Sequence, residues 1–202
     1  DVSTPVAVTV APAASIIIPT LGNYQSAAPS ATLHTPFGVR VGDASGFAVE
    51  GVEVQFTTAS PGASLSVSVD TTDARGYAEA TMTLGPALGD YATSATVSGT
   101  THNVTFNALA RTPPAFDIEV VFTAGSPTPS QAQAFRLAEE RWERIITGDV
   151  PDDHAVLPEW SCGAGPGLDR AIDDLVIYVN LSEIDGPGGI LGGAGVCFLH
   201  DV

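Results

Sequence analysis

The acidic residues between positions 149 and 159 are the first candidates for chemistry. Asp149, Asp152 and Asp153 are close in sequence, with His154 and Glu159 nearby. Hard cations such as Ca²⁺ bind several oxygen ligands at once. The three aspartates are therefore weak candidates for a calcium site. Their spacing matches no EF-hand loop, so an acidic surface loop is the alternative interpretation.

Two further groups have residue types that occur in active sites. Paired carboxylates can serve acid–base catalysis, and four aspartates follow later in the chain: Asp169, Asp173, Asp174 and Asp185. Acids this common also occur together by chance. The glycine-rich run at residues 186–195 lacks the Gly-Lys-Ser/Thr of a phosphate loop and the spacing of a dinucleotide fold. We therefore assign no catalytic residue and no cofactor.

The two cysteines, Cys162 and Cys197, both lie in the last quarter of the chain. In an exported protein they are expected to pair, closing a loop of about 35 residues worth roughly 3–4 kcal/mol in the chain-entropy model. Two buried thiols in a cytosolic protein are the alternative. Metal binding is less favoured, because no nearby Cys or His completes a four-ligand pattern.

Composition excludes several classes of partner. The 202 residues carry 23 acids and only 7 bases, all of them Arg, for a net charge of -16. Nucleic acids and anionic membranes need clustered Lys and Arg, so neither is expected as a partner. No apolar run is long enough for a transmembrane helix. The chain opens at Asp1 without a basic leader, which we interpret as a mature chain whose signal has been removed.

The chain divides into two parts around residues 111–115, where paired prolines predict a stiff extended linker. Before the linker, apolar residues alternate with polar ones and turn sequences separate the runs. Such a pattern predicts an antiparallel β-sandwich. Tyr91 stands where a tyrosine corner would lie, with its hydroxyl bonding back to the chain. The alternating positions are Phe37, Val39 and Val41; Val52, Val54 and Phe56; Leu65, Val67 and Val69; Ala78, Ala80, Met82 and Leu84; Ala95 and Val97; Val104, Phe106 and Ala108.

The second part carries the long helical pattern. Thr128 is a predicted N-cap, followed by Pro129 in the first turn and Gln131 as the partner in a capping box. Gly148 is the predicted helix end. Strands are predicted at residues 116–122 and, more fully buried, at 175–179, which gives a small α/β layer. The apolar stripe expected to face the core is Phe135, Ala138, Trp142, Ile145 and Ile146.

Several segments of the first part resemble the bacterial Ig-like domain of the invasin and intimin type. The resemblance covers about residues 15–110 and implies a secreted or surface-exposed bacterial protein in which the domain is a spacer or adhesive unit. It implies no particular activity. The segments that carry it are residues 23–26, 36–46, 49–56, 72–78 and 104–108.

An extra apolar segment precedes this pattern. Val6, Val8 and Val10 alternate between two prolines, which predicts a short strand. The strand either packs on its own domain or is donated to the sheet edge of a neighbouring chain. A second apolar run, able to belong to either partner, is Ile16, Ile17 and Ile18.

The second part is similar to the front half of a leishmanolysin-like domain from secreted bacterial proteins. The segments concerned are residues 116–122, 138–149, 173–177 and 184–195. In that family they precede a helix with His-Glu-x-x-His, which holds zinc and supplies the general base. The four histidines of this chain include no pair separated by three residues, so no catalytic residue can be carried over.

These observations predict a mainly β chain, an Ig-like antiparallel sandwich followed by a small α/β domain with one main helix. The expected boundaries are 1–13 for the extra strand, 14–110 for the sandwich, 111–115 for the linker and 116–202 for the α/β domain. The expected function is that of a secreted or cell-surface structural or adhesive module without catalysis and without cofactors, self-assembling into an extracellular filament by strand addition. The alternatives are a fragment of a zinc metallopeptidase and a calcium- or glycan-binding module; other surface proteins or glycans are candidate partners.

Overall fold

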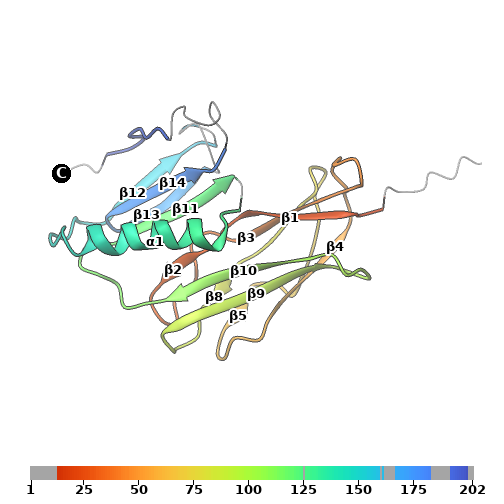
Figure 1. The fold of residues 1–202 in the computed structure, drawn as a ribbon, viewed down its shortest axis with the longest axis horizontal. Coiled ribbons are helices and arrows are strands. Elements are labelled where there is room, and N and C mark those ends of the chain that lie inside the picture. The colour runs from red at the N-terminus through yellow and green to blue at the C-terminus, as the bar shows by residue number, and fades with distance from the viewer. Residues whose placement is uncertain (1–12, 125, 160, 162–166, 183–191, 200–202) are drawn as a thin grey trace, which may run out of the picture.

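The alternating residues of the first half form a β-sandwich in the computed structural model, which describes residues 13–124, 126–159, 161, 167–182 and 192–199. The chain is mainly β, an Ig-like sandwich followed by a small α/β unit with one main helix. Figure 1 shows the sandwich at one end of the molecule and the α/β unit at the other. We use "sandwich" for the described residues up to 110 and "α/β unit" for those from 116 onward.

The sandwich has two principal sheets. One has the strand order β1-β3-β7 and the other the order β2-β10-β9-β4-β6, while β5 and β8 form a short additional pair. Neighbouring strands are antiparallel except β2, which runs parallel to β10. The strands are β1 (Ile16–Leu21), β2 (Gln25–Ala27), β3 (Phe37–Gly42), β4 (Glu53–Thr58), β5 (Ser64–Leu65), β6 (Val69–Thr71), β7 (Tyr77–Ala80), β8 (Met82–Thr83), β9 (Gly89–Val97) and β10 (Asn103–Ala110).

The core lies between these sheets and uses the alternating positions. Phe37 and Phe106 come from opposite sheets and stack with their ring centroids 4.8 Å apart. Val39, Val54 and Met82 are fully buried around them. Because side chains of a strand point alternately to its two faces, the polar residues between these positions face solvent.

Two turns with the same chemistry connect the strands. Asp43 Oδ1 accepts hydrogen bonds from the backbone N–H groups of Ser45 and Phe47, and Asp73 Oδ1 does the same for the second and fourth residues after it. Each turn ends in a glycine with positive φ; at Gly76 an added Cβ would lie 2.5 Å from the Val41 carbonyl oxygen. The turn sequences therefore fix where these strands reverse.

The predicted tyrosine corner is confirmed. Tyr91 lies in β9, the next-to-last strand of the sandwich, and is 5% exposed. Its hydroxyl donates to the carbonyl oxygen of Ala87, four residues earlier, at 2.8 Å. This bond fixes the turn before β9 against the sheet.

The strand boundaries differ from the predicted runs at two places. The run from Leu65 to Val69 is split into β5 and β6, and Val67 and Val69 are exposed. The run from Ala78 to Leu84 is split into β7 and β8, although its alternate side chains are buried as predicted. Both splits have one cause, because β5 pairs with β8 while β6 and β7 belong to the two principal sheets.

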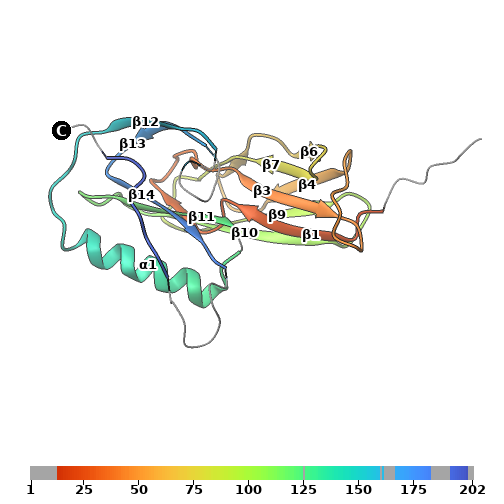
Figure 2. The ribbon, with the colours of Figure 1, turned by 90° about the horizontal axis from the view of Figure 1, so that it is seen from above.

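The α/β unit begins with β11 (Ile118–Ala124), which pairs in parallel with β14 (Leu175–Asn180). The helix α1 (Pro129–Glu143) packs against β11, where Phe122 and Phe135 meet edge to face at 5.2 Å. The antiparallel pair β12 (Asp153–Leu157) and β13 (Leu168–Ile172) was not individually predicted. Figure 2 shows α1 on one side of β11 and β14, with β12 and β13 on the other.

The predicted start of the helix is confirmed. Thr128 is the N-cap, its side chain accepts from the Gln131 backbone N–H, and the Gln131 side chain bonds back to the Thr128 N–H. The predicted end at Gly148 is wrong, because α1 ends at Glu143 with Arg144 as its C-cap.

The predicted buried stripe of residues 135–146 is correct for Phe135 and wrong for most of its other members. Trp142 and Ile145 are 54% and 55% exposed, and Ala138 is exposed as well. The face directed at β11 contains the half-buried Phe135 as predicted, together with the buried Ala132 and Glu143. The physical reason is a buried arginine that requires carboxylate partners from this helix, as described below.

β14 is less buried than predicted. Leu175 and Ile177 are 39% and 40% exposed, while Val176 and Tyr178 pack on the small cluster of Ala155, Leu168 and Ile172. One face of β14 is therefore covered by β12 and β13, and the other is partly open.

None of the helices in the described residues is long and apolar enough to cross a membrane.

Candidate functional site

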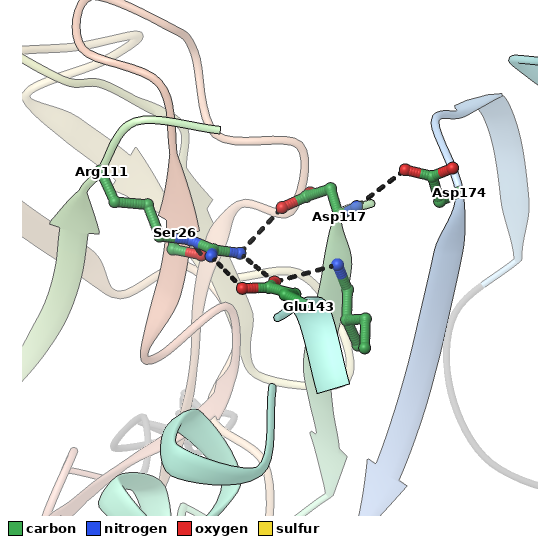
Figure 3. A network of polar contacts seen from close by, with 6 residues as sticks. Ser26, Arg111, Asp117, Glu143 and Asp174 are labelled. Atoms are coloured by element: carbon green, nitrogen blue, oxygen red, sulfur yellow. Dashed lines mark hydrogen bonds and ion pairs between the residues drawn. The ribbon is translucent and has the colours of Figure 1, made fainter. Parts of the chain in front are cut away.

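A group of buried charges lies where the sandwich meets the α/β unit (Figure 3). Arg111 directly follows β10, and its backbone N–H donates to the Ala27 carbonyl of β2 at 3.0 Å. Its side-chain Nε donates to Ser26 Oγ at 2.9 Å. The guanidinium then reaches carboxylates of the α/β unit, so this one side chain contacts both modules. We call Ser26, Arg111, Asp117 and Glu143 the Arg111 junction.

Glu143 is the main partner of the guanidinium. Arg111 Nη1 donates to Oε2 at 2.7 Å and Nη2 donates to Oε1 at 2.8 Å, which makes the pair bidentate. Nη2 also donates to Asp117 Oδ1 at 2.8 Å. The side chains of Arg111 and Glu143 are only 19% and 5% exposed. Such charge-assisted bonds replace the hydration that both ions lose on burial.

Backbone groups complete the junction. Glu143 Oε1 also accepts from the Ile118 N–H at 3.2 Å. The buried carboxylate of Asp174 accepts from the Asp117 N–H and from the Val150 N–H, both at 2.7 Å. The start of β11 is therefore bonded to the end of α1 through Glu143 and to the turn before β14 through Asp174.

The charges of the junction are not balanced. Three carboxylates, those of Asp117, Glu139 and Glu143, interact with the single guanidinium of Arg111. The pKa of Glu139 is raised to about 7, first by burial and also by the negative charges of Glu143 and Asp117, while the charge of Arg111 opposes the rise. Burial also raises the pKa of Asp117. Burial opposes the charge of Arg111, but the hydrogen bond to Glu143 and the charge of Asp117 give it a raised pKa overall.

A second arginine joins the layers of the α/β unit. Arg170 of β13 forms an ion pair with Glu119 of β11, and both side chains are largely buried. This pair lies on the sheet face that does not carry α1. The described buried charges thus engage one another across element boundaries, which makes the arrangement a structural joint.

The structure places the calcium candidates in different surroundings. Asp149 comes together with Asp173 and Asp174, with carboxylate oxygens within 4.8 Å of one another. Burial raises the pKa of Asp173, and the charges of Asp174, Asp152 and Asp149 add to this rise. Asp152 thus borders the group. Both carboxylate oxygens of Asp174 already accept a backbone hydrogen bond, which leaves fewer lone pairs for a cation. The calcium site stays a prediction.

The third calcium candidate, Asp153, and its neighbour His154 are not part of this group. Asp153 lies in β12 and accepts from its neighbour's backbone, the N–H of His154. His154 Nε2 lies 3.4 Å from Asp169 Oδ1, and both side chains are well exposed. The aspartates considered for acid–base chemistry therefore divide between two places, and Asp185 lies outside the described residues.

The assembly and disulfide predictions are partly outside the described residues. Val6, Val8 and Val10 lie there, as does Cys162, while Cys197 is disulfide-bonded. The isoleucines of the second apolar run belong to β1 and pair with β3 of the same chain: Ile16 with Gly42, Ile17 with Val41 and Ile18 with Arg40. Their role in assembly stays a prediction.

Sequence reasoning missed the junction. It placed Arg111 in the linker, and it expected the buried side of the helix to be an apolar stripe without a carboxylate. A usable signal was present, because Ala132, Phe135, Glu139 and Glu143 lie on one helical face at spacings of three and four residues. Acids on the same face as a buried apolar residue indicate a buried cation nearby, but not which one.

Comparison with known proteins gives distant likenesses only. The sequence matches no known protein family. No curated protein matches it either. Among solved structures, the D00-D0 domain of intimin is 21% identical, with 48% of each chain covered and a TM-score of 0.40. A C-terminal 282-residue fragment of intimin, in complex with the intimin-binding domain of the translocated intimin receptor, is 24% identical with a TM-score of 0.40.

The lengths compared are partial in both cases. The match to the intimin fragment covers 50% of this chain and 34% of the fragment. The D0-D1 domain of intimin is 24% identical over 47% of this chain and 49% of its own, with a TM-score of 0.38. This chain therefore spans about half or less of each of these structures.

Proposed function

We propose that this chain is a structural and adhesive module of a bacterial protein that is secreted or held at the cell surface, and that it has no catalysis of its own. The Ig-like sandwich and the sequence resemblance to invasin-type domains support this proposal. The disulfide at Cys197 fits an oxidising location outside the cytosol. Partners are other copies of the chain, surface proteins or glycans.

The Arg111 junction is the observation that carries the proposal. A module that acts in a chain of modules must keep its joints fixed when it bears load. Here a buried bidentate ion pair connects the end of the sandwich to the α/β unit, and β11 packs against β1 and β2 of the sandwich. A flexible tether would leave domain motion as the default. These contacts support the proposal that the two modules move together.

Self-association by strand addition is the second part of the proposal. The alternating Val6, Val8 and Val10 have the pattern of an added strand, whose backbone bonds give affinity and whose alternate side chains fill pockets. The net charge of -16 opposes association, so apolar strand contacts must outweigh the repulsion.

Negative-stain electron microscopy at high protein concentration tests this function. The proposal predicts elongated assemblies, and nuclear magnetic resonance then shows residues 6–10 protected in a sheet. A strict monomer at high concentration, with residues 1–12 mobile in solution, would contradict it.

A second candidate is the front part of a leishmanolysin-like zinc metallopeptidase. The specific observation in its favour is a set of exposed apolar side chains on α1 and just after it, since Leu137, Trp142 and Ile145 are more than half exposed among the described residues. Exposed apolar patches mark surfaces that another polypeptide covers. The coding sequence after Val202 tests this candidate. A His-Glu-x-x-His motif there, together with zinc in the longer protein, would favour the enzyme, whereas its absence would remove it.

A further inference from the structure

We propose that the free edge of β1, at residues 16–18, accepts residues 6–10 of a second copy of this chain as an added β-strand. The inference rests on the proposed function, because it names the acceptor for the proposed strand addition. It is based on which outer strands of the sandwich are already covered by side chains or by the α/β unit.

The side of the sandwich formed by β6 and β7 is closed by side chains. Asp70 Oδ2 of β6 accepts from the Glu79 N–H of β7 at 2.8 Å. Ser66 Oγ accepts from the Thr81 N–H at 2.9 Å. These edge donors have partners within the chain, so an incoming strand would have to displace them.

The edge at β2 is covered by the junction. β11 packs against β2, and Arg111 bonds to both Ser26 and Ala27. The C-terminal part of β1 is also close to the α/β unit, since Pro19 and Leu21 line the same small surface depression as Phe122. Among the outer strands of the two principal sheets in the described sandwich, the N-terminal part of β1 is left.

The backbone of β1 has bonding groups directed to this open side. The Val41 N–H of β3 donates to Gly76 near β7, so the neighbouring Arg40 and Gly42 direct their groups toward β1. Their partners Ile18 and Ile16 therefore face β3, and the N–H and C=O of Ile17 between them face outward. Pro19 has no N–H, which limits an added strand to the residues before it.

The side chains beside this edge are apolar. Ile16 and Ile18 are 38% and 44% exposed on the outer face, while Ile17 packs against the sandwich core. A strand with valine at alternate positions would extend one of these two apolar faces. Val6, Val8 and Val10 supply that alternation.

Local geometry favours a second copy over the chain's own N-terminus. Ala13, Ala14 and Ser15 enter β1 without a turn, and Figure 1 shows this end of β1 directed away from both modules. For residues 6–10 to pair with β1 of their own chain directly, residues 11 and 12 would have to form a two-residue hairpin turn. Such a turn needs positive φ at its first position. Alanine disfavours positive φ, and a residue before proline is biased to extended backbone.

This pairing makes the contact heterologous. Each copy offers one donor strand and one acceptor edge, so the contact repeats head to tail and does not close unless the rotation forms a ring. Raising the salt concentration screens the repulsion between acidic copies and is expected to promote the contact.

Disulfide cross-linking between two differently marked copies tests the inference. Chains carrying V8C are mixed with chains carrying I16C, I17C or I18C and oxidised mildly, with the wild-type chain as a blank for the native cysteines. Residues opposite each other on neighbouring strands have Cβ atoms about 4.5–5.5 Å apart. A cross-linked heterodimer is therefore expected with at least one β1 position. The matched controls Y77C on β7 and I177C on β14 should stay at the level of the blank.

Each other result contradicts a definite part of the argument. Oligomers in light scattering without a β1 cross-link, or with a cross-link only at Tyr77 or Ile177, would overturn the assigned edge but keep self-association. A V8C/I17C double variant that forms an internal disulfide as a monomer would show that the strand folds back on its own chain. A monomer without any cross-link would overturn both proposals.

Discussion

Arg111 binds both carboxylate oxygens of Glu143, at 2.7 and 2.8 Å, across the boundary between the sandwich and the α/β unit. The two residues are 32 positions apart in sequence. Their pairing connects the last strand of the sandwich to the last turn of α1, and it decides which face of that helix is buried.

Removal of the arginine is expected to cost far more stability than removal of an exposed one. R111M leaves Glu143 charged and buried without its partner, which typically costs about 3–5 kcal/mol of unfolding free energy. The matched control is R75M, because the Arg75–Asp73 pair is exposed and exposed ion pairs contribute little to stability. Urea unfolding of both variants measures the difference. Equal effects would contradict the structural role of the junction.

Replacement of both Arg111 and Glu143 tests whether the two side chains contribute to stability as a pair. The double variant R111M/E143M removes the buried charges together, and apolar replacements of buried ion pairs are often neutral. We expect it to be more stable than R111M. If the double variant is as unstable as the sum of the single variants, the two side chains do not act as a pair.

The pH dependence of stability is expected to depend on Glu139. Its pKa is raised from 4.5 to about 7 in the folded chain, so the folded state binds the proton more tightly than the unfolded state. Stability therefore falls as pH rises from about 4.5 to about 7. The loss is at most about 3 kcal/mol, and it is smaller in practice because Glu139 is half-buried.

The variant E139Q removes this dependence. It should be more stable than the wild-type chain at pH 8 and about equal to it at pH 4.5. E79Q, at an exposed position of β7, is the control and should leave the profile unchanged. Thermal unfolding across this range measures all three chains. The prediction would be contradicted if the wild-type chain became more stable between pH 5 and 7 and E139Q abolished that rise.

The tyrosine corner is expected to contribute about 1 kcal/mol, the usual net value of one hydrogen bond. Y91F keeps the buried ring and removes the bond to the Ala87 carbonyl. Y77F is the matched control, because Tyr77 is 40% exposed. Unfolding curves that shift equally for the two variants would contradict the role given to Tyr91.

The acidic group around Asp173 is expected to repel itself at neutral pH. Because the pKa of Asp173 is raised by burial and by Asp174, Asp152 and Asp149, D173N should raise the melting temperature at pH 7 and not at pH 3. A lower melting temperature at pH 7 would contradict this repulsion.

The same samples test the calcium prediction, since identical melting curves with calcium and with chelator would remove it.

Local patterns in the sequence were sufficient for the sandwich. Period-two alternation identified Phe37, Val39 and Val41 as core residues, and all three are buried. The helix start at Thr128 and the corner at Tyr91 depend on bonds to residues three or four positions away. Signals of this range can be read directly from the chain.

The junction depends on contacts that no local pattern contains. The burial of Glu143 follows from Arg111, and the burial of Asp174 follows from the backbone of Asp117 and Val150. Apolar periodicity therefore selected Trp142 for the core, although the charge requirement turns another face of α1 inward. The candidate assembly edge likewise requires sheet order, because the position of β1 beside β3 alone is not evident from its three isoleucines.

Light scattering over a range of protein concentrations tests the central claim, self-association through the N-terminal strand, most directly. The wild-type chain is compared with V6D/V8D/V10D and with the matched control Q55D/T57D/T105D, which adds the same charge at exposed positions of the sandwich. For the wild-type chain and the control, we expect an average molar mass that grows with protein and salt concentration. For the valine variant, we expect the mass of a monomer. A monomeric wild-type chain, or a valine variant that assembles equally well, would contradict it.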